Sequence, residues 1–111
     1  MGKPALSFSH VGIWVTDLET MRDFYTDVLG FVMTDRGPIG DTELVFLSQA
    51  TSDHHQIVLA KGRPKDVGFT TVNQISFKLD TLEALKAAHA EIVTKPVKEL
   101  VQISHGNAWS I

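Results

Sequence analysis

Apolar and polar residues follow one pattern in two separate stretches of the chain. The first stretch is SHVGIWVTDLETMRDFYTDVLGF at residues 9–31, and the second is NQISFKLDTLEALKAAH at residues 73–89. They align without a gap at a constant shift of 64 residues, which places Val11 over Ile75. Each begins with strand-like alternation and continues as an amphipathic helix. A repeated supersecondary unit fixes the architecture, so we expect a pseudo-symmetric sheet with a groove between two halves.

The first repeat and the residues after it predict a β-α-β-β-β module over residues 7–60. The alternation predicts strands at residues 7–15, 31–35, 43–47 and 56–60, with a turn at 37–41. Thr16 and Glu19 have the spacing of a capping box at the start of the helix. Gly30 stands where a left-handed residue would end it. The apolar stripe of this helix should therefore pack on the sheet.

The second repeat predicts a shorter module over residues 73–111, after a linker at residues 61–72 that contains Gly, Pro and several charges. We expect strands at residues 73–79, 100–103 and 108–111, and a helix at residues 82–92. Asp80 or Thr81 would start that helix. The second copy of the fourth strand would fall beyond the last residue, so we expect an incomplete module with one unpaired sheet edge.

The polar residues at the strand starts mark one face of the predicted sheet. His10, Gln56 and Gln74 alternate away from the apolar residues that belong under the helices. Trp14 and Ser76 follow on the same faces of their strands. The face of a curved sheet opposite the helices lines a cavity, so these side chains form a candidate ligand-binding set.

Length and composition limit the class of protein. The 111 residues suffice for one domain, and we expect a single α+β domain over residues 1–111, with paired βαβββ modules forming a curved mixed sheet around a cavity. A net charge of −3 without basic runs argues against a nucleic-acid partner. The absence of cysteine excludes disulfides and thiolate ligands and fits a reducing compartment. No apolar run is long enough to span a membrane, so we expect a soluble, cytoplasmic protein.

The histidines carry most of the candidate chemistry, and each has a simpler alternative. His10 either contacts a ligand or only hydrogen-bonds near the start of an edge strand. His54 and His55 are adjacent, so within a strand they would face opposite ways and at most one would reach the cavity. A solvated loop end is the simpler interpretation of that pair. His89 is expected on the surface of the second helix, and His105 either at the rim of the cavity or only in a turn.

The first repeat resembles the opening βα unit of the vicinal oxygen chelate superfamily, which includes glyoxalase I, bleomycin and fosfomycin resistance proteins, and extradiol dioxygenases. The matching pieces are His10, the VTDL turn, the FY pair and the LGF triplet that follow it. The segments HHQIVLAKGRP, VNQISFKL and SHGNAWSI are similar to a small branch labelled after biphenyl-2,3-diol 1,2-dioxygenase. This resemblance covers nearly the whole chain. It implies paired modules forming a cup around a divalent metal, and a homodimer whose interface includes the first strand or the C-terminal region.

The resemblance also implies where metal ligands would lie. His10 matches the histidine of the first strand, Gln56 the ligand position of the fourth strand, and Gln74 the first-strand position of the second module. The final ligand, commonly a glutamate, would lie beyond Ile111. An iron extradiol site needs two histidines and a carboxylate, whereas a neutral amide supplies no charge to the cation. This set would therefore hold Fe(II) or Mn(II) weakly.

Two functions of different classes remain open. The first is a dioxygenase-like enzyme that cleaves a catechol-type ring with a divalent metal at His10. In that enzyme His55 or His105 would be a substitute ligand or a catalytic acid–base group. The second is a metal-free protein that binds or sequesters a small aromatic or polar molecule through the candidate ligand-binding set. The residue chemistry favours the second function, and the resemblance favours the first.

Overall fold

The structure is a computed structural model that describes residues 2–104, 106 and 108–111. The chain divides into two compact units, Met1–Gly68 and Phe69–Ile111, and each is described by itself. The division falls inside the predicted linker. None of the helices formed by the described residues is long and apolar enough to cross a membrane.

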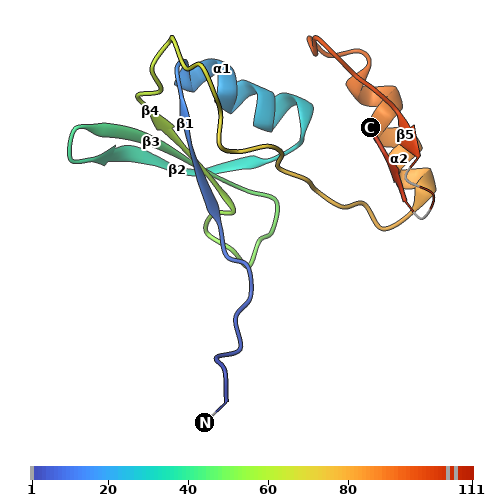
Figure 1. The fold of residues 1–111 in the computed structure, drawn as a ribbon, viewed down its shortest axis with the longest axis horizontal. Coiled ribbons are helices and arrows are strands. Elements are labelled where there is room, and N and C mark those ends of the chain that lie inside the picture. The colour runs from blue at the N-terminus through green and yellow to red at the C-terminus, as the bar shows by residue number, and fades with distance from the viewer. Residues whose placement is uncertain (1, 105, 107) are drawn as a thin grey trace. The chain divides into compact units, whose positions relative to one another are not determined.

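A mixed four-stranded sheet forms the first unit, in the order β1-β4-β3-β2 (Figure 1). The strands are β1 (Val11–Val15), β2 (Val32–Ile39), β3 (Thr42–Ser48) and β4 (Ile57–Lys61). β1 runs parallel to β4, and the other two pairs are antiparallel. The first and last strands of the module are therefore neighbours, and the segments that lead into them arrive at the same end of the sheet.

All four strands differ from their predicted bounds, and β1 and β2 differ by more than one residue. β1 begins at Val11, so residues 7–10 precede the strand. β2 extends to Ile39, and only Gly40 and Asp41 remain in the turn, with Gly40 at a φ of 61°. Pro38 is tolerated within β2 because this is an edge strand, where a missing backbone N–H costs no hydrogen bond on the open side.

Helix α1 (Leu18–Asp23) begins one residue later than the predicted capping box. Asp17 has an extended backbone with a φ of −121°, and its carboxylate accepts a hydrogen bond from the N–H of Thr20 at 3.0 Å. Hydrogen bonding from Thr20 lowers the pKa of the Asp17 carboxyl. The prediction that Thr16 caps the helix is wrong, because the residue after it makes the capping bond.

The helix ends in a π-helical segment, η1 (Phe24–Val28), followed by Gly30 at a φ of 74°. The left-handed glycine is as predicted, and it lets the N–H of Phe31 donate to the carbonyl of Tyr25 at 2.9 Å. The rings of Tyr25 and Phe31 then meet edge to face with their centroids 5.4 Å apart. Both side chains are buried.

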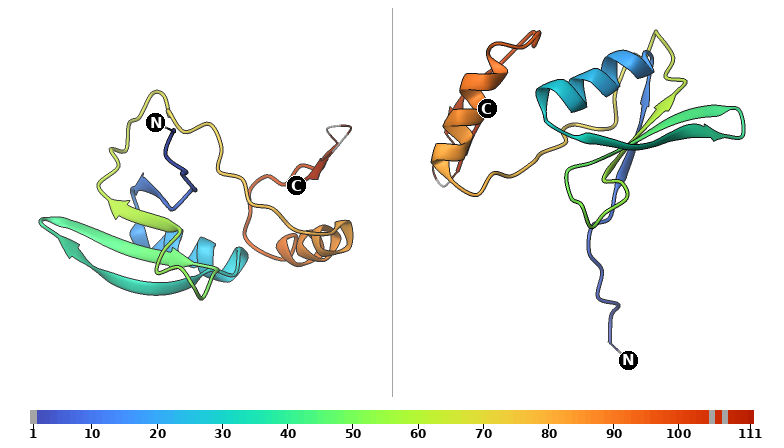
Figure 2. Two further views of the ribbon diagram at one scale, coloured as in Figure 1. Left: turned by 90° about the horizontal axis from the view of Figure 1, so that it is seen from below. Right: turned by 180° about the vertical axis from the view of Figure 1, so that it is seen from behind.

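The helical segment lies on one side of the sheet (Figure 2), and the core of the first unit lies between them. Alternate residues of three strands point to it, and each is at most 4% exposed: Val15, Val45, Leu47, Ile57 and Leu59. Burying a side chain of this size stabilises a fold by about 1.5–3 kcal/mol. The predicted packing of the helix on the sheet is confirmed, and the first unit has its own core.

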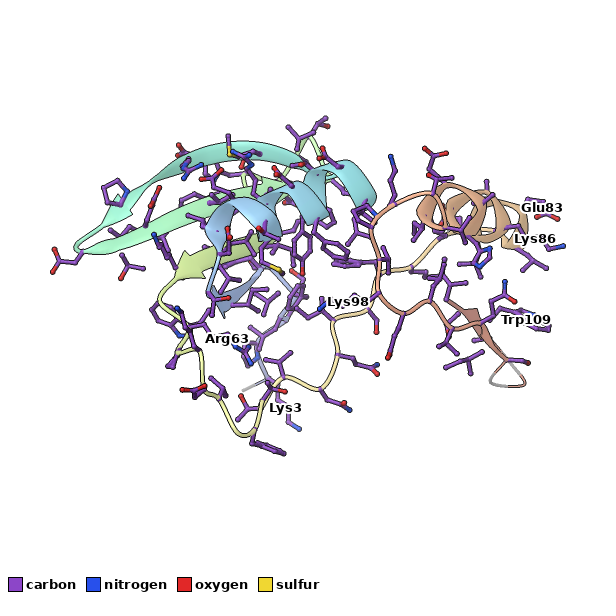
Figure 3. The ribbon with its side chains drawn as sticks, turned by 90° about the horizontal axis from the view of Figure 1, so that it is seen from above. Lys3, Arg63, Glu83, Lys86, Lys98 and Trp109 are labelled. Carbon is purple, nitrogen blue, oxygen red and sulfur yellow. The ribbon has the colours of Figure 1, made fainter. Side chains whose placement is uncertain are left out.

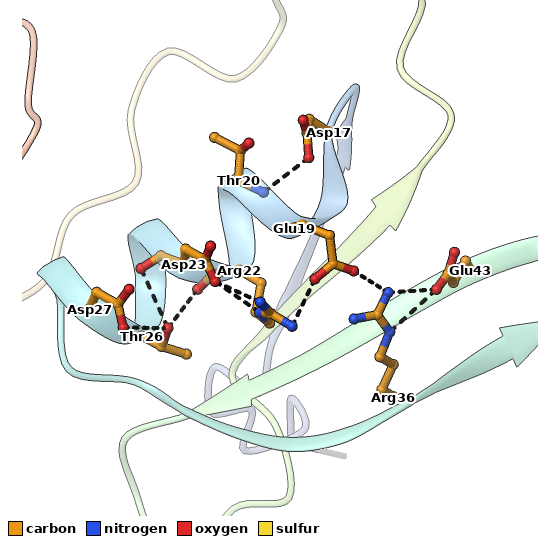
Figure 4. Close-up of polar contacts among 9 residues, drawn as sticks. All are labelled: Asp17, Glu19, Thr20, Arg22, Asp23, Thr26, Asp27, Arg36 and Glu43. Atoms are coloured by element: carbon orange, nitrogen blue, oxygen red, sulfur yellow. Dashed lines mark hydrogen bonds and ion pairs between the residues drawn. The ribbon is translucent and has the colours of Figure 1, made fainter.

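A chain of ion pairs joins the helix to the strands on the same side (Figure 4). The guanidinium of Arg36 in β2 pairs with Glu19 of α1 and with Glu43 of β3, the latter at 2.7 Å. Glu19 also pairs with Arg22 at 2.7 Å. The hydrogen bond from Arg36 lowers the pKa of Glu19 and raises that of Arg36. Exposed ion pairs contribute little stability individually, so this series of ion pairs orients the helix more than it stabilises the fold.

The second unit contains helix α2 (Leu82–Ile92) and a hairpin of β5 (Ile103–Ser104) and β6 (Trp109–Ser110). The bounds of α2 are those predicted. The hydroxyl of Thr81 accepts the N–H of Ala84 at 3.1 Å, which makes Thr81 the cap. Glu83, Lys86 and Trp109 are exposed side chains of this unit (Figure 3).

The predicted strand at residues 73–79 is wrong, because none of these residues lies in a strand. The strands predicted at 100–103 and 108–111 shrink to the two-residue strands β5 and β6. Alternating residues form a strand only where a partner supplies hydrogen bonds to the backbone. The four-stranded sheet takes all of its strands from the first unit, so the βαβββ module is confirmed for that half.

Candidate ligand-binding site

One face of the first unit's sheet points away from the helix, and we call it the open face. Its exposed or half-buried residues include Gly12, Trp14, Phe46, Val58 and Ala60, and the buried Leu44 lies on the same face beside Ala60. The register places Gly12 beside Val58 and Val58 beside Phe46. The side chain of Trp14 is 59% exposed. The two-sided alternation predicted for these strands is therefore present.

Two histidine rings, those of His54 and His55, contact Phe46 at one end of the open face, and the ring of His10 contacts that of His55; we call these four residues the histidine cluster. The ring centroid of His55 lies 4.4 Å from that of His10 and 5.1 Å from that of Phe46. The ring centroid of His54 lies 5.1 Å from that of His55 and 5.6 Å from that of Phe46. His10 precedes β1, and the other two histidines precede β4. Because these strands are parallel, both segments reach the same place.

The adjacent histidines differ in one respect from the sequence-based expectation. β4 begins only at Ile57, so His54 and His55 lie in a loop, where strand alternation does not apply. Both rings reach Phe46, and His55 is half-buried. The pair does lie at a loop end, as expected, with His54 exposed and His55 half-buried against Phe46.

The electrostatics of the histidine cluster favour the neutral form of His55. Partial burial lowers the pKa of His55, and the nearby rings of His10 and His54 lower it further. Asp35 faces His54, with Oδ2 3.6 Å from Nε2. The Nδ1 atoms of His54 and His55 are 2.9 Å apart, so one donates and the other accepts. A neutral imidazole has one N–H that donates a hydrogen bond and one nitrogen that accepts one.

Gln56 contacts the loop backbone through its side chain. Its Oε1 accepts the N–H of Gln49 at 2.9 Å. Its own backbone joins both neighbouring strands, because its carbonyl accepts from Val11 at 3.0 Å and its N–H donates to Leu47 at 2.7 Å. In this structure Gln56 anchors the loop that carries the two adjacent histidines.

Trp14 lies at the other end of the open face, against Gly62. A Cβ added to Gly62 would lie 3.4 Å from Cζ3 of the indole. Gly62 has a φ of 138°, a conformation that side-chain-bearing residues rarely adopt. The N–H groups of Gly62 and Arg63 both donate to the carbonyl of Val15, at 3.0 and 3.1 Å. The chain after β4 thus crosses the end of β1 beside the indole.

The remaining predicted site residues belong to the second unit. The amide of Gln74 donates to the hydroxyl of Ser76 at 3.2 Å, so these two form a pair of their own. His89 is half-buried, with its Nε2 3.0 Å from Nε2 of Gln102, which differs from the expected surface position. His105 lies outside the described residues. Within the first unit, the structure brings His10 and His55 together.

The donors in the described part of the chain do not fit the metal site that the resemblance implies. No group of three His, Asp or Glu side chains among these residues is arranged to hold a metal ion. The ring beside His10 is another imidazole, and Asp35 faces His54 instead. A facial triad needs two histidines and a carboxylate directed at one point.

Sequence reasoning missed Phe46 as a site residue. In residues 44–47 both faces of the strand are apolar, so no polar residue marked the open face there. The pairing of Phe46 with Val58 would have revealed it, but a strand register is not readable from alternation alone.

The family assignment comes from a match over residues 7–109 to the Glyoxalase/Bleomycin resistance protein/Dioxygenase superfamily. The chain therefore belongs to this superfamily, as its opening residues predicted. The four-stranded sheet with its helix is consistent with one βαβββ module of that fold. The comparison with curated proteins found no match.

Proposed function

We propose that this chain is a small-molecule-binding member of the superfamily, and that its ligand is a planar aromatic molecule on the open face of the first unit. The observation that carries the proposal is the edge-to-face contact of His10 and His55 at 4.4 Å, beside the half-buried ring of Phe46. Small-molecule sites are mostly apolar, with a few polar groups that fix the orientation of the ligand. The open face has this composition.

Each part of the proposed site contributes a separate interaction. The ring of Phe46 offers aromatic surface at the histidine end of the open face, where a ligand ring gains edge-to-face or offset contacts, and the indole of Trp14 offers such surface at the other end. The ring nitrogens of His10 and His55 offer hydrogen-bonding groups for a hydroxyl or carbonyl oxygen. An aromatic molecule with one oxygen group, such as a phenol or catechol, therefore suits the site.

Ring cleavage by a metal-dependent dioxygenase is the second candidate, because the superfamily's name includes dioxygenases. The donors around His10 do not supply the triad that this chemistry needs, so we derive no metal step. Metal analysis decides between the two functions. Stoichiometric Fe(II) or Mn(II) that is lost in His10→Ala and kept in His89→Ala would favour the dioxygenase.

The binding function is tested with catechol, phenol and benzoate as probes and a cyclohexanol control of similar size. Trp109→Phe leaves Trp14 as the single indole, and its fluorescence reports on the open face. We expect a saturable change with the aromatic probes. His55→Ala and Phe46→Leu should each weaken binding about tenfold, which corresponds to ~1.4 kcal/mol.

The control variant is His89→Ala in the same background, which should bind as the parent does. If none of the three aromatic probes gives a saturable signal up to about 10 mM, where affinity is negligible, the proposed function is wrong.

A further inference from the structure

Strand β2 carries an irregularity beside the histidine cluster. Met33 pairs with Leu47 and Asp35 pairs with Phe46, so the register shifts across Thr34 and leaves it as an extra residue. Such a β-bulge bends the strand and redirects a side chain, and bulges are frequent next to binding and active sites.

The bulge directs Thr34 toward the loop that carries the histidines. Its hydroxyl donates to the backbone carbonyl of His54, and it also lies 3.3 Å from the carbonyl oxygen of Phe46. The neighbouring Asp35 faces the ring of His54 at 3.6 Å. Thr34 and Asp35 of the bulged segment therefore contact both the main chain and the ring of His54.

The loop before β4 depends on such side-chain contacts because its residues lie outside the sheet. Gln56 anchors one end of it through Gln49, as described above. Near His54, the hydroxyl of Thr34 supplies a bond to the loop backbone. A backbone carbonyl outside a ladder bonds either to water or to a side chain, and the bond from Thr34 ties this one to β2.

We propose that Thr34 is a positioning residue, which holds the backbone of His54 so that His55 stays against His10 and Phe46. The consequence for ligand binding rests on the proposed function, whereas the effect on ring geometry does not. Threonine suits the role because it is β-branched, which favours a strand, and carries its hydroxyl on a short stem. Valine has the same shape without the donor, and serine keeps the donor.

Thr34→Val and Thr34→Ser separate the hydrogen bond from the packing. In the ligand-free protein, proton–carbon correlation spectra resolve the histidine ring resonances, which respond to neighbouring rings. We expect Thr34→Val to shift the resonances of His54 and His55, and Thr34→Ser to leave them near their original positions. Thr42→Val, a matched change at the start of β3, should not move them. Thr34→Ala replaces the valine variant if that variant does not fold.

Catechol affinity is measured on the same variants. Losing one net hydrogen bond should weaken binding about threefold or more in Thr34→Val, and Thr34→Ser should restore it. Unmoved resonances in Thr34→Val would overturn the inference. If Thr34→Val shifts the resonances and the parent binds none of the three aromatic probes, the positioning role is supported and the proposed function is overturned.

Discussion

In the first unit, the strand of the first repeat is β1, which pairs with β4 along its whole length. Val15 at the end of β1 is only 4% exposed. In the second unit, the corresponding residues 73–79 lie in no strand, and no described residue of 69–111 is buried. The two stretches have the same alternation and the same helical stripe. An apolar pattern therefore selects the face that can be buried, whereas burial itself requires a partner surface.

Helix α2 shows that a correct local pattern does not by itself bury a helix. It has its cap at Thr81 and its predicted apolar stripe, and yet none of its residues is buried. An isolated helix of this length is marginally stable in water, and most helical stability in proteins comes from packing. Local signals thus determine where α2 begins and ends, and they supply little of its stability.

The largest expected difference between the units concerns truncation of a leucine. Leu47→Ala removes a side chain that is 0% exposed, so we expect a loss of about 2–5 kcal/mol in the free energy of unfolding. Leu85 is half-buried, so Leu85→Ala should lower the free energy of unfolding by less than about 1 kcal/mol. Urea unfolding measures both. Equal losses would contradict the view that only the first unit has a core.

The next effect concerns assembly. Phe69, Val101 and Trp109 of the second unit are at least 60% exposed, and apolar residues of this kind favour association. We predict a homodimer with about twice the chain mass of 12.2 kDa in light scattering at micromolar concentration. Trp109→Ser should raise its dissociation constant about tenfold, a change of ~1.4 kcal/mol.

Ile39→Ser is the matched control for assembly, because Ile39 is 67% exposed at the hairpin of the first unit. It should leave the dissociation constant unchanged. A well-behaved monomer of the parent chain would show that the exposed apolar residues of the second unit need no partner.

A smaller effect tests the corrected helix cap. Asp17→Ala removes the carboxylate that accepts from Thr20, and we expect a loss of about 1 kcal/mol in the free energy of unfolding. Thr16→Ala should cost much less. The reverse ranking in chemical denaturation would restore the capping box predicted from the sequence.

The smallest effect is a pH dependence of the first unit. The pKa of His55 is lowered from 6.5, so the folded state binds its proton more weakly than the unfolded state does. This contribution to stability is complete above about pH 6.5 and is lost as the pH falls toward the lower folded pKa. In His55→Gln the unfolding midpoint should depend less on pH over that interval. A parent midpoint that is constant between pH 7 and 5 would count against the lowered pKa.

Prediction from the sequence succeeded where the signal is local. The bounds of α2 and the left-handed Gly30 follow from caps, apolar stripes and glycine chemistry within a few residues. The strand at residues 73–79 failed because strand formation depends on a partner far away in the sequence. His10 was predicted as a site residue from its place near the start of the first strand, and the structure puts its ring beside that of His55.

The rest of the candidate site depends on register, which alternation does not encode. The contact of His55 with Phe46 follows from which residues of β3 and β4 pair. The bulge at Thr34 adds one residue to a strand and changes no composition, so nothing in the sequence marks it.

The parallel pairing of β1 with β4 has a consequence for the order in which the first unit folds. β2, β3 and β4 pair as successive antiparallel neighbours and can form early, whereas β1 must wait for a strand far along the chain. Closing that long loop costs entropy before any contact repays it. His10 arrives with β1, so we expect the candidate site to assemble only in the last step of folding. A partly folded chain would hold Phe46 in place and still lack the ring that completes the site.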